Sequence, residues 1–180
     1  HAPRREQSAK MLIDAFMPEG ITQLAVDSIF MMPQLGVLAH VDKKEFSEDA
    51  RKAALEVFHK DCLIRLGTCI TPIGKAKLGE VILNAVLTLS DGTIKEKELI
   101  MGEIVRLEAP YEAIQVVLRP SKSMDIGGGK GQEIETNIFG GTVGLIFDGR
   151  DRPITIPANQ EERLKSIRSW SDALNEYPKS

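Results

Sequence analysis

The sequence has little of several things that often reveal a function. Its 180 residues include two cysteines, one tryptophan and only 5% aromatic residues, and the formal net charge is −3. So few aromatic side chains provide no platform for stacked bases, and this charge does not draw the whole molecule to nucleic acid or anionic lipid. No apolar run is as long as a transmembrane helix, and no signal peptide is visible. We therefore expect a cytoplasmic protein that binds neither nucleic acid nor membrane.

The common catalytic signatures are also missing. There is no C-x-x-C or H-E-x-x-H pattern for zinc and no G-x-S-x-G pattern for a nucleophilic serine. Neither His40 nor His59 lies where it would activate a nucleophile. Cys62 and Cys69 are expected to be buried free thiols. We expect no catalytic residue, no metal site and no cofactor.

What is present suits a globular fold, with 42% hydrophobic and 27% charged residues. Helical spacing of apolar residues predicts a helical segment at 1–60. A β-rich domain of about seven short strands joined by turns follows at 61–157. Helical spacing then returns at 158–180, where a helix is expected to pack on the β-rich domain. The predicted fold class is α+β: N-terminal helices, an antiparallel β-barrel or sandwich, and a C-terminal helix.

Two helices are predicted most strongly. Residues 47–60 combine good helix formers with an apolar stripe, and Ser47 stands where a cap is needed. Residues 161–175 also carry apolar side chains at helical spacing, and Trp170 is expected to dock this helix. Asp14 and Asp27 stand in apolar stretches, where a carboxylate needs a partner. We expect each of them to cap a helix.

An apolar, glycine-rich stretch at 138–157 stands out. Its segment 142–147 is too apolar for a strand with one wet face, so both faces are expected to be covered. Asp148 and Gly149 form a strong turn dipeptide, because glycine tolerates positive φ and aspartate can hydrogen-bond its own backbone. We therefore predict a tight hairpin with 154–156 as the returning strand.

Charged residues beside this buried strand are one candidate ligand site. Asp148, Arg150 and Arg152 follow the strand directly. Two interpretations stay open. The charges keep a hairpin turn hydrated, which we favour, or they form a polar site at the strand end.

The glycine-rich loop at 121–131 is the other candidate. It matches neither the phosphate-binding P-loop nor the dinucleotide-binding fingerprint, because the glycines and the following strand are wrongly placed. Gly128, Gly129 and Lys130 still offer backbone N–H groups beside a positive charge, which is a pattern that can hold an anion. A mobile hairpin loop is the interpretation we favour.

Two segments resemble a known family. GGTVGLIFDGRDRP at 140–153 and FMMPQLGVLA at 30–39 are similar to the C-terminal part of glutamate mutase L-type proteins. These are accessory proteins encoded with cobalamin-dependent carbon-skeleton mutases or aminomutases. The segments DCLIRLGTCITPIG and LRPSKSMDIGGGKG also fit the longer members. Asp151 departs from the family pattern, in which a small residue is expected at this position of the turn.

The resemblance implies a function as well as a fold. The large N-terminal part of the family resembles sugar-kinase, actin and Hsp70-type ATPases, and its Asp-x-Gly-x-Thr nucleotide motif is not in this sequence. The chain would then be a non-enzymatic interaction or regulatory domain that gives chaperone-like support to a cobalamin-dependent mutase. Its partner would be the mutase or the ATPase part of the same protein. The alternative is a small β domain that binds an anionic ligand through the glycine loop, Arg150 and Arg152.

Overall fold

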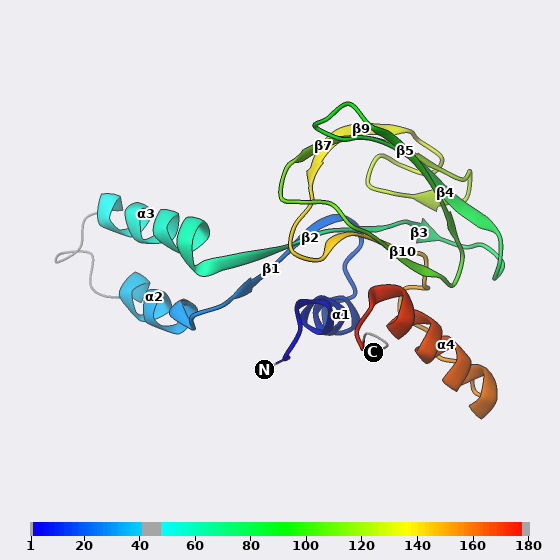
Figure 1. The fold of residues 1–180 in the computed structure, drawn as a ribbon, viewed down its shortest axis with the longest axis horizontal. Helices are drawn as coiled ribbons and strands as arrows, with labels where there is room; N and C mark the ends of the chain where they lie inside the picture. Colours follow the sequence, from blue (N-terminus) through cyan, green and yellow to red (C-terminus); the bar gives the residue numbers. More distant parts are fainter. Residues whose placement is uncertain (1, 41–47, 178–180) are drawn as a thin grey trace. The chain divides into compact units, whose positions relative to one another are not determined.

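The computed structural model describes residues 2–40 and 48–177 (Figure 1). In chain order its elements are α1 (Arg5–Phe16), β1 (Gly20–Asp27), α2 (Met31–His40), α3 (Glu48–Val57), the π-helix η1 (Phe58–Cys62), β2 (Leu63–Thr71), β3 (Ile73–Gly74), β4 (Val81–Thr88), β5 (Ile94–Ile100), β6 (Ile104–Leu107), β7 (Ala113–Pro120), β8 (Met124–Asp125), β9 (Ile134–Phe139), β10 (Gly144–Asp148) and α4 (Gln160–Leu174). The predicted cap Ser47 lies outside the described residues.

The chain forms two compact units. One comprises His1–Leu24 and Leu66–Ser180 and is called the β unit here; the other comprises Ala25–Arg65 and is called the helical unit. The strands, α1 and α4 dominate the β unit, whereas α2, α3 and η1 lie in the helical unit.

These units differ from the predicted division into 1–60, 61–157 and 158–180. The first helix was assigned to a helical segment, but Ala9 and Ile13 of α1 are fully buried in the β unit. The periodicity of a helix shows which of its faces is apolar, and it does not show which distant element covers that face.

The strands of the structure form three sheets. One has the order β1-β2-β10-β6, a second has the order β5-β4-β7-β9, and β3 pairs with β8. The α+β class with several antiparallel strands is confirmed, whereas no closed barrel is found among the described residues. One pairing departs from the antiparallel expectation, because β10 runs parallel to β2 with Leu145 opposite Thr68.

A hairpin at the Asp91-Gly92 dipeptide joins β4 to β5. Strands β4 and β5 are antiparallel, with Thr88 opposite Ile94. The Asp91 carboxylate accepts a hydrogen bond of 2.8 Å from the Thr93 amide, and Gly92 has a φ of 81°. This is the turn chemistry that an Asp-Gly pair favours.

The predicted hairpin after β10 is wrong. Residues 154–156 form no strand. Gly149 instead donates its amide to the Glu103 carbonyl at 2.7 Å and accepts from the Gly102 amide at 2.8 Å. A Cβ added at Gly149 would lie 2.5 Å from the Ile100 carbonyl oxygen, so this glycine allows a close backbone approach.

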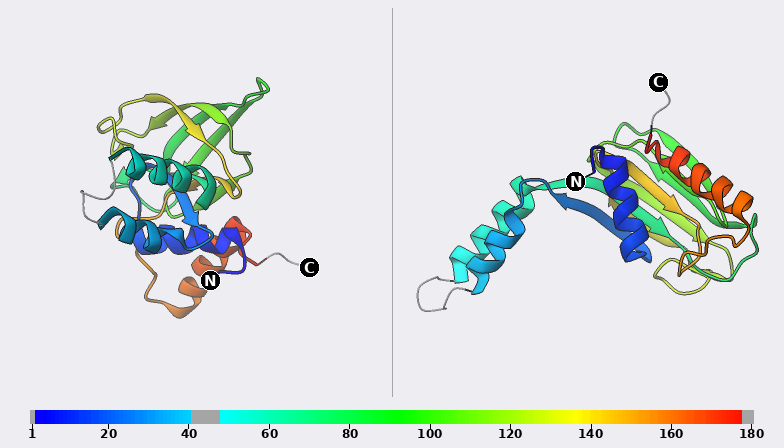
Figure 2. Two further views of the ribbon diagram at one scale, coloured as in Figure 1. Left: turned by 90° about the vertical axis from the view of Figure 1, so that its left-hand side faces the viewer. Right: turned by 90° about the horizontal axis from the view of Figure 1, so that it is seen from below.

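The core of the β unit is shared by its two four-stranded sheets. Fully buried side chains such as Ile70 and Phe147 come from one sheet, and Leu87 and Leu118 come from the other. Figures 1 and 2 show α1 and α4 side by side on the face of the β1-β2-β10-β6 sheet that points away from the β5-β4-β7-β9 sheet. Strand β10 is therefore covered on both faces, as predicted, and every one of its residues is buried.

Candidate functional site

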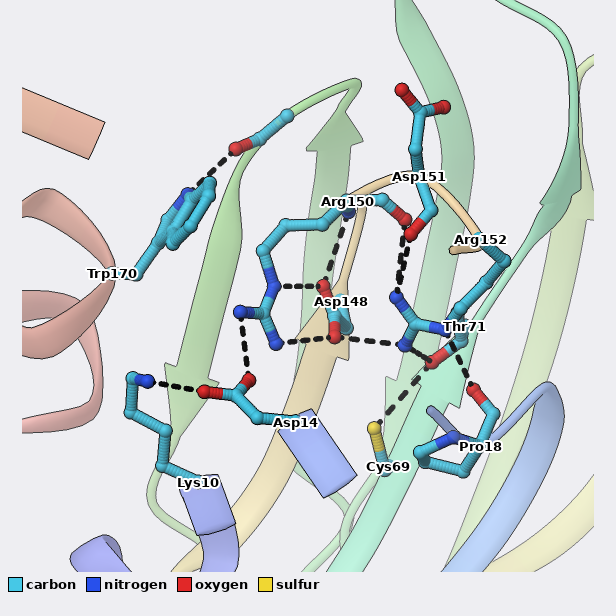
Figure 3. A network of polar contacts seen from close by, with 11 residues as sticks. Lys10, Asp14, Pro18, Cys69, Thr71, Asp148, Arg150, Asp151, Arg152 and Trp170 are labelled. Carbon is cyan, nitrogen blue, oxygen red and sulfur yellow. Dashed lines mark hydrogen bonds and ion pairs between the residues drawn. The ribbon is translucent and has the colours of Figure 1, made fainter. Parts of the chain in front are cut away.

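A network of buried charges lies at the end of β10 (Figure 3). Asp148 is fully buried and Arg150 is 3% exposed. The Arg150 guanidinium donates from Nε to Asp148 Oδ1 and from Nη2 to Oδ2, each at 2.9 Å. Its backbone amide also donates to Oδ1 at 3.1 Å. This two-pronged contact is the strongest arrangement that an arginine and a carboxylate form.

Arg152 binds the same carboxylate from the other side. Its Nη2 donates to Asp148 Oδ2 at 2.9 Å and to Thr71 Oγ1 at 3.2 Å. Its Nε donates to the Pro18 carbonyl at 3.2 Å, and Nη1 donates to the carbonyls of Arg150 and Asp151. Each nitrogen of this guanidinium therefore has a partner within the chain.

Both helices of the β unit also contact Arg150. Asp14 of α1 places its Oδ1 2.9 Å from Arg150 Nη1 and forms an ion pair with Lys10 on its other side. The Trp170 ring of α4 lies 5.0 Å from the Arg150 guanidinium and donates its Nε1 hydrogen to the Gly102 carbonyl at 2.9 Å. Stacking of this kind is favourable when the cation is desolvated. The prediction that Trp170 docks the last helix is confirmed.

Burial and charge have opposite effects on these groups. Burial alone would raise the pKa of Asp148, but the hydrogen bonds and charge of Arg150, followed by those of Arg152, hold it below the ordinary value. Burial alone would lower the pKa of Arg150, but Asp148 and then Asp14 hold it above the ordinary value. Both groups therefore stay ionised, and neither is suited to exchange a proton near neutral pH.

Cys69 lies beside this network and is chemically quiet. It is fully buried, and burial followed by the Asp148 charge raises the pKa of its thiol to about 12. A nucleophilic cysteine needs the opposite environment, which stabilises the thiolate. Cys62 is also buried, and the prediction of two buried free thiols is confirmed.

The network joins elements of the fold to one another. Two carboxylates, Asp148 and Asp14, face two guanidiniums, Arg150 and Arg152, and the contacts link β10 to α1 and α4. A buried charge is stable only when it is paired, and each of these four forms an ion pair with at least one group of opposite charge. The arrangement thus acts as an internal clamp and offers no open cationic surface to an anion.

The glycine loop has hydrogen-bond partners of its own. Asp125 Oδ1 accepts from the Gly127 amide at 2.7 Å and from the Gly129 amide at 3.0 Å. Lys130 and Gly128 are exposed. The hydrogen bonds and ion pairs of the charged network include none of Gly128, Gly129 and Lys130, so the two predicted groups remain separate.

The sequence identified the central residues of the charged network but not the residues that contact them. Asp148, Arg150 and Arg152 were candidates, but Thr71 and Lys10 were not. Asp14 was expected to cap a helix and instead pairs with Arg150. The available signal was a carboxylate in an apolar stretch, which requires a buried cation or donor.

The second predicted cap, Asp27, is confirmed and lies in the helical unit. Its carboxylate accepts from the Ile29 amide at 3.2 Å and from the Met32 amide at 2.7 Å. Burial alone would raise the pKa of Asp27, but these backbone donors, led by Met32, hold it below the ordinary value. Asp27 thus fixes the turn that precedes α2.

Comparison with family models, with curated proteins and with solved structures gave no match to this chain. Within residues 2–40 and 48–177, no group of three or more His, Cys, Asp and Glu side chains is placed to hold a metal ion. In the same part of the chain, no helix has both the length and the apolar character needed to cross a bilayer.

Proposed function

We propose that this chain is a non-enzymatic interaction module that supports a cobalamin-dependent mutase, as the carboxy-terminal part of a glutamate mutase L-type accessory protein. Its partner is the mutase itself or the ATPase part of the same protein. The family assignment rests on the two sequence segments at 30–39 and 140–153. The interaction role rests on the surface of the helical unit.

The observation that carries the proposal is how little of the helical unit is covered. Among its described hydrophobic residues only Phe58 and Cys62 are buried, whereas six large apolar side chains are exposed: Ile29, Phe30, Met32, Val37, Leu55 and Val57. Exposed apolar side chains in such density are typical of a surface that binds another protein.

The turn before α2 adds a second argument. Phe30 has a φ of 57°, which is unfavourable for a bulky residue, and its side chain is 57% exposed. Asp27 holds the turn through the Ile29 and Met32 amides, and Ser28 donates from N and Oγ to the Cys62 carbonyl at 3.1 and 3.0 Å. Strained backbone kept in place by several hydrogen bonds is common where a side chain is presented for binding.

The alternative of an anion-binding domain has less support. Arg150 and Arg152 already bind Asp148, and the Gly129 amide already binds Asp125. An anion at either place would have to displace an internal carboxylate.

Isothermal titration tests the proposal. The whole chain is titrated with the mutase and, separately, with the ATPase part. We expect saturable binding to one of them, weakened about tenfold or more by Phe30→Ser, because a central aromatic anchor dominates such interfaces. Phe16→Ser is the matched control, since Phe16 is also exposed but belongs to the β unit. The absence of binding to both partners would refute the proposal.

A further inference from the structure

One face of α3 and η1 combines basic and apolar side chains around a hollow. Lys52, Leu55, Glu56, His59 and Lys60 follow one another at helical spacing and line this hollow together with Arg65. Its volume is about 580 Å³, it is open to solvent, and all six residues belong to the helical unit. Residues three and four apart share one face of a helix, so these side chains point to the same side.

Positive charge predominates in this hollow. Lys52, Lys60 and Arg65 line it with a single carboxylate, Glu56. Lys52 has an ion pair of 3.3 Å with Glu48, but both side chains are mostly exposed, and such pairs are weak. Arg65 Nη2 donates to the His59 carbonyl at 2.9 Å, which fixes the arginine at the edge of η1.

The hollow also has an apolar component. Leu55, the one apolar side chain among the six, is 53% exposed. A shallow, partly apolar surface that carries basic side chains is complementary to a ligand with an apolar ridge and acidic flanks.

We propose that this hollow receives an acidic amphipathic helix of a partner protein. Apolar side chains of that helix pack on Leu55, and its carboxylates face Lys52, Lys60 and Arg65. The π-helical turn η1, a feature often found at functional sites, continues this face beyond α3. The inference rests on the proposed function, because it names the surface and the kind of partner segment that an interaction module would use.

Fluorescence anisotropy with designed peptides tests the proposal. One set of labelled helical peptides carries leucines on one face and glutamates beside them, and a matched set carries lysines in place of the glutamates. We expect the whole chain to bind the acidic set, with affinity that falls as salt rises, and to bind the lysine set at least about tenfold more weakly.

Charge variants of the chain locate the binding. Lys52→Glu with Lys60→Glu should weaken binding of the acidic peptides at least about tenfold, and Glu56→Gln should strengthen it severalfold. Lys165→Glu, an exposed lysine on α4 of the β unit, should leave it unchanged. Circular dichroism checks that each variant is folded.

The outcomes separate this inference from the proposed function. Equal binding of both peptide sets, no binding of the acidic set, or insensitivity to the Lys52 and Lys60 changes would overturn the inference. Binding to vesicles of anionic lipid in place of the peptides would overturn it in favour of a membrane surface. If the mutase binds and Lys52→Glu with Lys60→Glu leaves that binding intact, the proposed function stands and this surface is wrong. If the acidic peptides bind as expected and neither natural partner does, the surface stands and the proposed function is wrong.

Discussion

Replacing Asp148 by asparagine should destabilise the β unit strongly. The carboxylate accepts from the amide, Nε and Nη2 of Arg150 and from Nη2 of Arg152. An asparagine keeps one acceptor oxygen but turns an NH₂ group toward two guanidinium donors. Arg152 then keeps its charge without a carboxylate, and Arg150 keeps only the partly exposed Asp14 although it is too deeply buried for water to compensate. Breaking a buried ion pair in this way typically costs about 3–5 kcal/mol.

Urea unfolding measures this loss. Trp170 is the only tryptophan and stacks on Arg150, so its fluorescence reports on this part of the β unit. Asp14→Asn is the matched control, because Asp14 also pairs with Arg150 but its side chain is 36% exposed. We expect the control to lower the free energy of unfolding by only about 1 kcal/mol. Equal small losses in both variants would refute the view that Asp148 is the centre of the clamp.

The pH dependence gives an independent check. The folded-state pKa of Asp148 lies below the ordinary 3.8, so its ionised form stabilises the fold at all pH values above 3.8. That contribution is lost as pH falls through the lower, folded-state value. The difference in unfolding free energy between the natural chain and Asp148→Asn should therefore be constant near neutral pH and shrink below about pH 4. A difference that grows on acidification would contradict the assignment.

Three further predictions concern the core. Gly67→Ala should lower the free energy of unfolding by more than about 4 kcal/mol or prevent folding, because the added Cβ would lie 1.7 Å from a β10 carbonyl oxygen. Gly79→Ala is the control: Gly79 has positive φ but open space around it, so this change should cost only about 1 kcal/mol in urea unfolding. Similar losses in the two variants would contradict this. Trp170→Phe removes the hydrogen bond to the Gly102 carbonyl and part of the stacking on Arg150, which together should lower the free energy of unfolding by about 1–2 kcal/mol. The melting temperature measured by circular dichroism should therefore fall by about 3–6 °C. An unchanged melting temperature would count against the docking role. Cys62 and Cys69 should react with Ellman's reagent only after unfolding, and rapid reaction of the folded chain would contradict their burial.

The local signals in the sequence predicted local structure well. The C-terminal helix around Trp170 and the doubly covered strand β10 both follow from the residues themselves. Each depends on neighbours within a few positions, where periodicity and turn chemistry are informative.

The long-range pairings were not predictable in this way. Strands β2 and β10 pair in parallel although they are distant in sequence, with Gly67 opposite Gly144. Both glycines have positive φ, and neither has space for a Cβ, so backbone contact explains their presence. Asp148-Gly149 has the composition of a hairpin turn, but no returning strand follows it, and the Asp148 carboxylate accepts hydrogen bonds from Arg150 and Arg152. Only the three-dimensional arrangement shows which partner prevails.

The sequence identified the residues at the centre of the candidate site but did not predict that they bind one another. The sequence placed charge beside a buried strand, and the structure pairs that charge internally, with Asp14 supplied by a helix far away in the chain. The exposed apolar residues of the helical unit were not recognised as a surface, because periodicity reports an apolar face and gives no sign of whether it is covered.

Hydrogen-exchange mass spectrometry of the chain, alone and with saturating mutase or ATPase part, is the most direct test of binding through the helical unit. We expect a partner to slow amide exchange in α3 and η1 and in the turn before α2. Protection confined to the glycine loop at 121–131 and to 148–152, with no change in the helical unit, would contradict it.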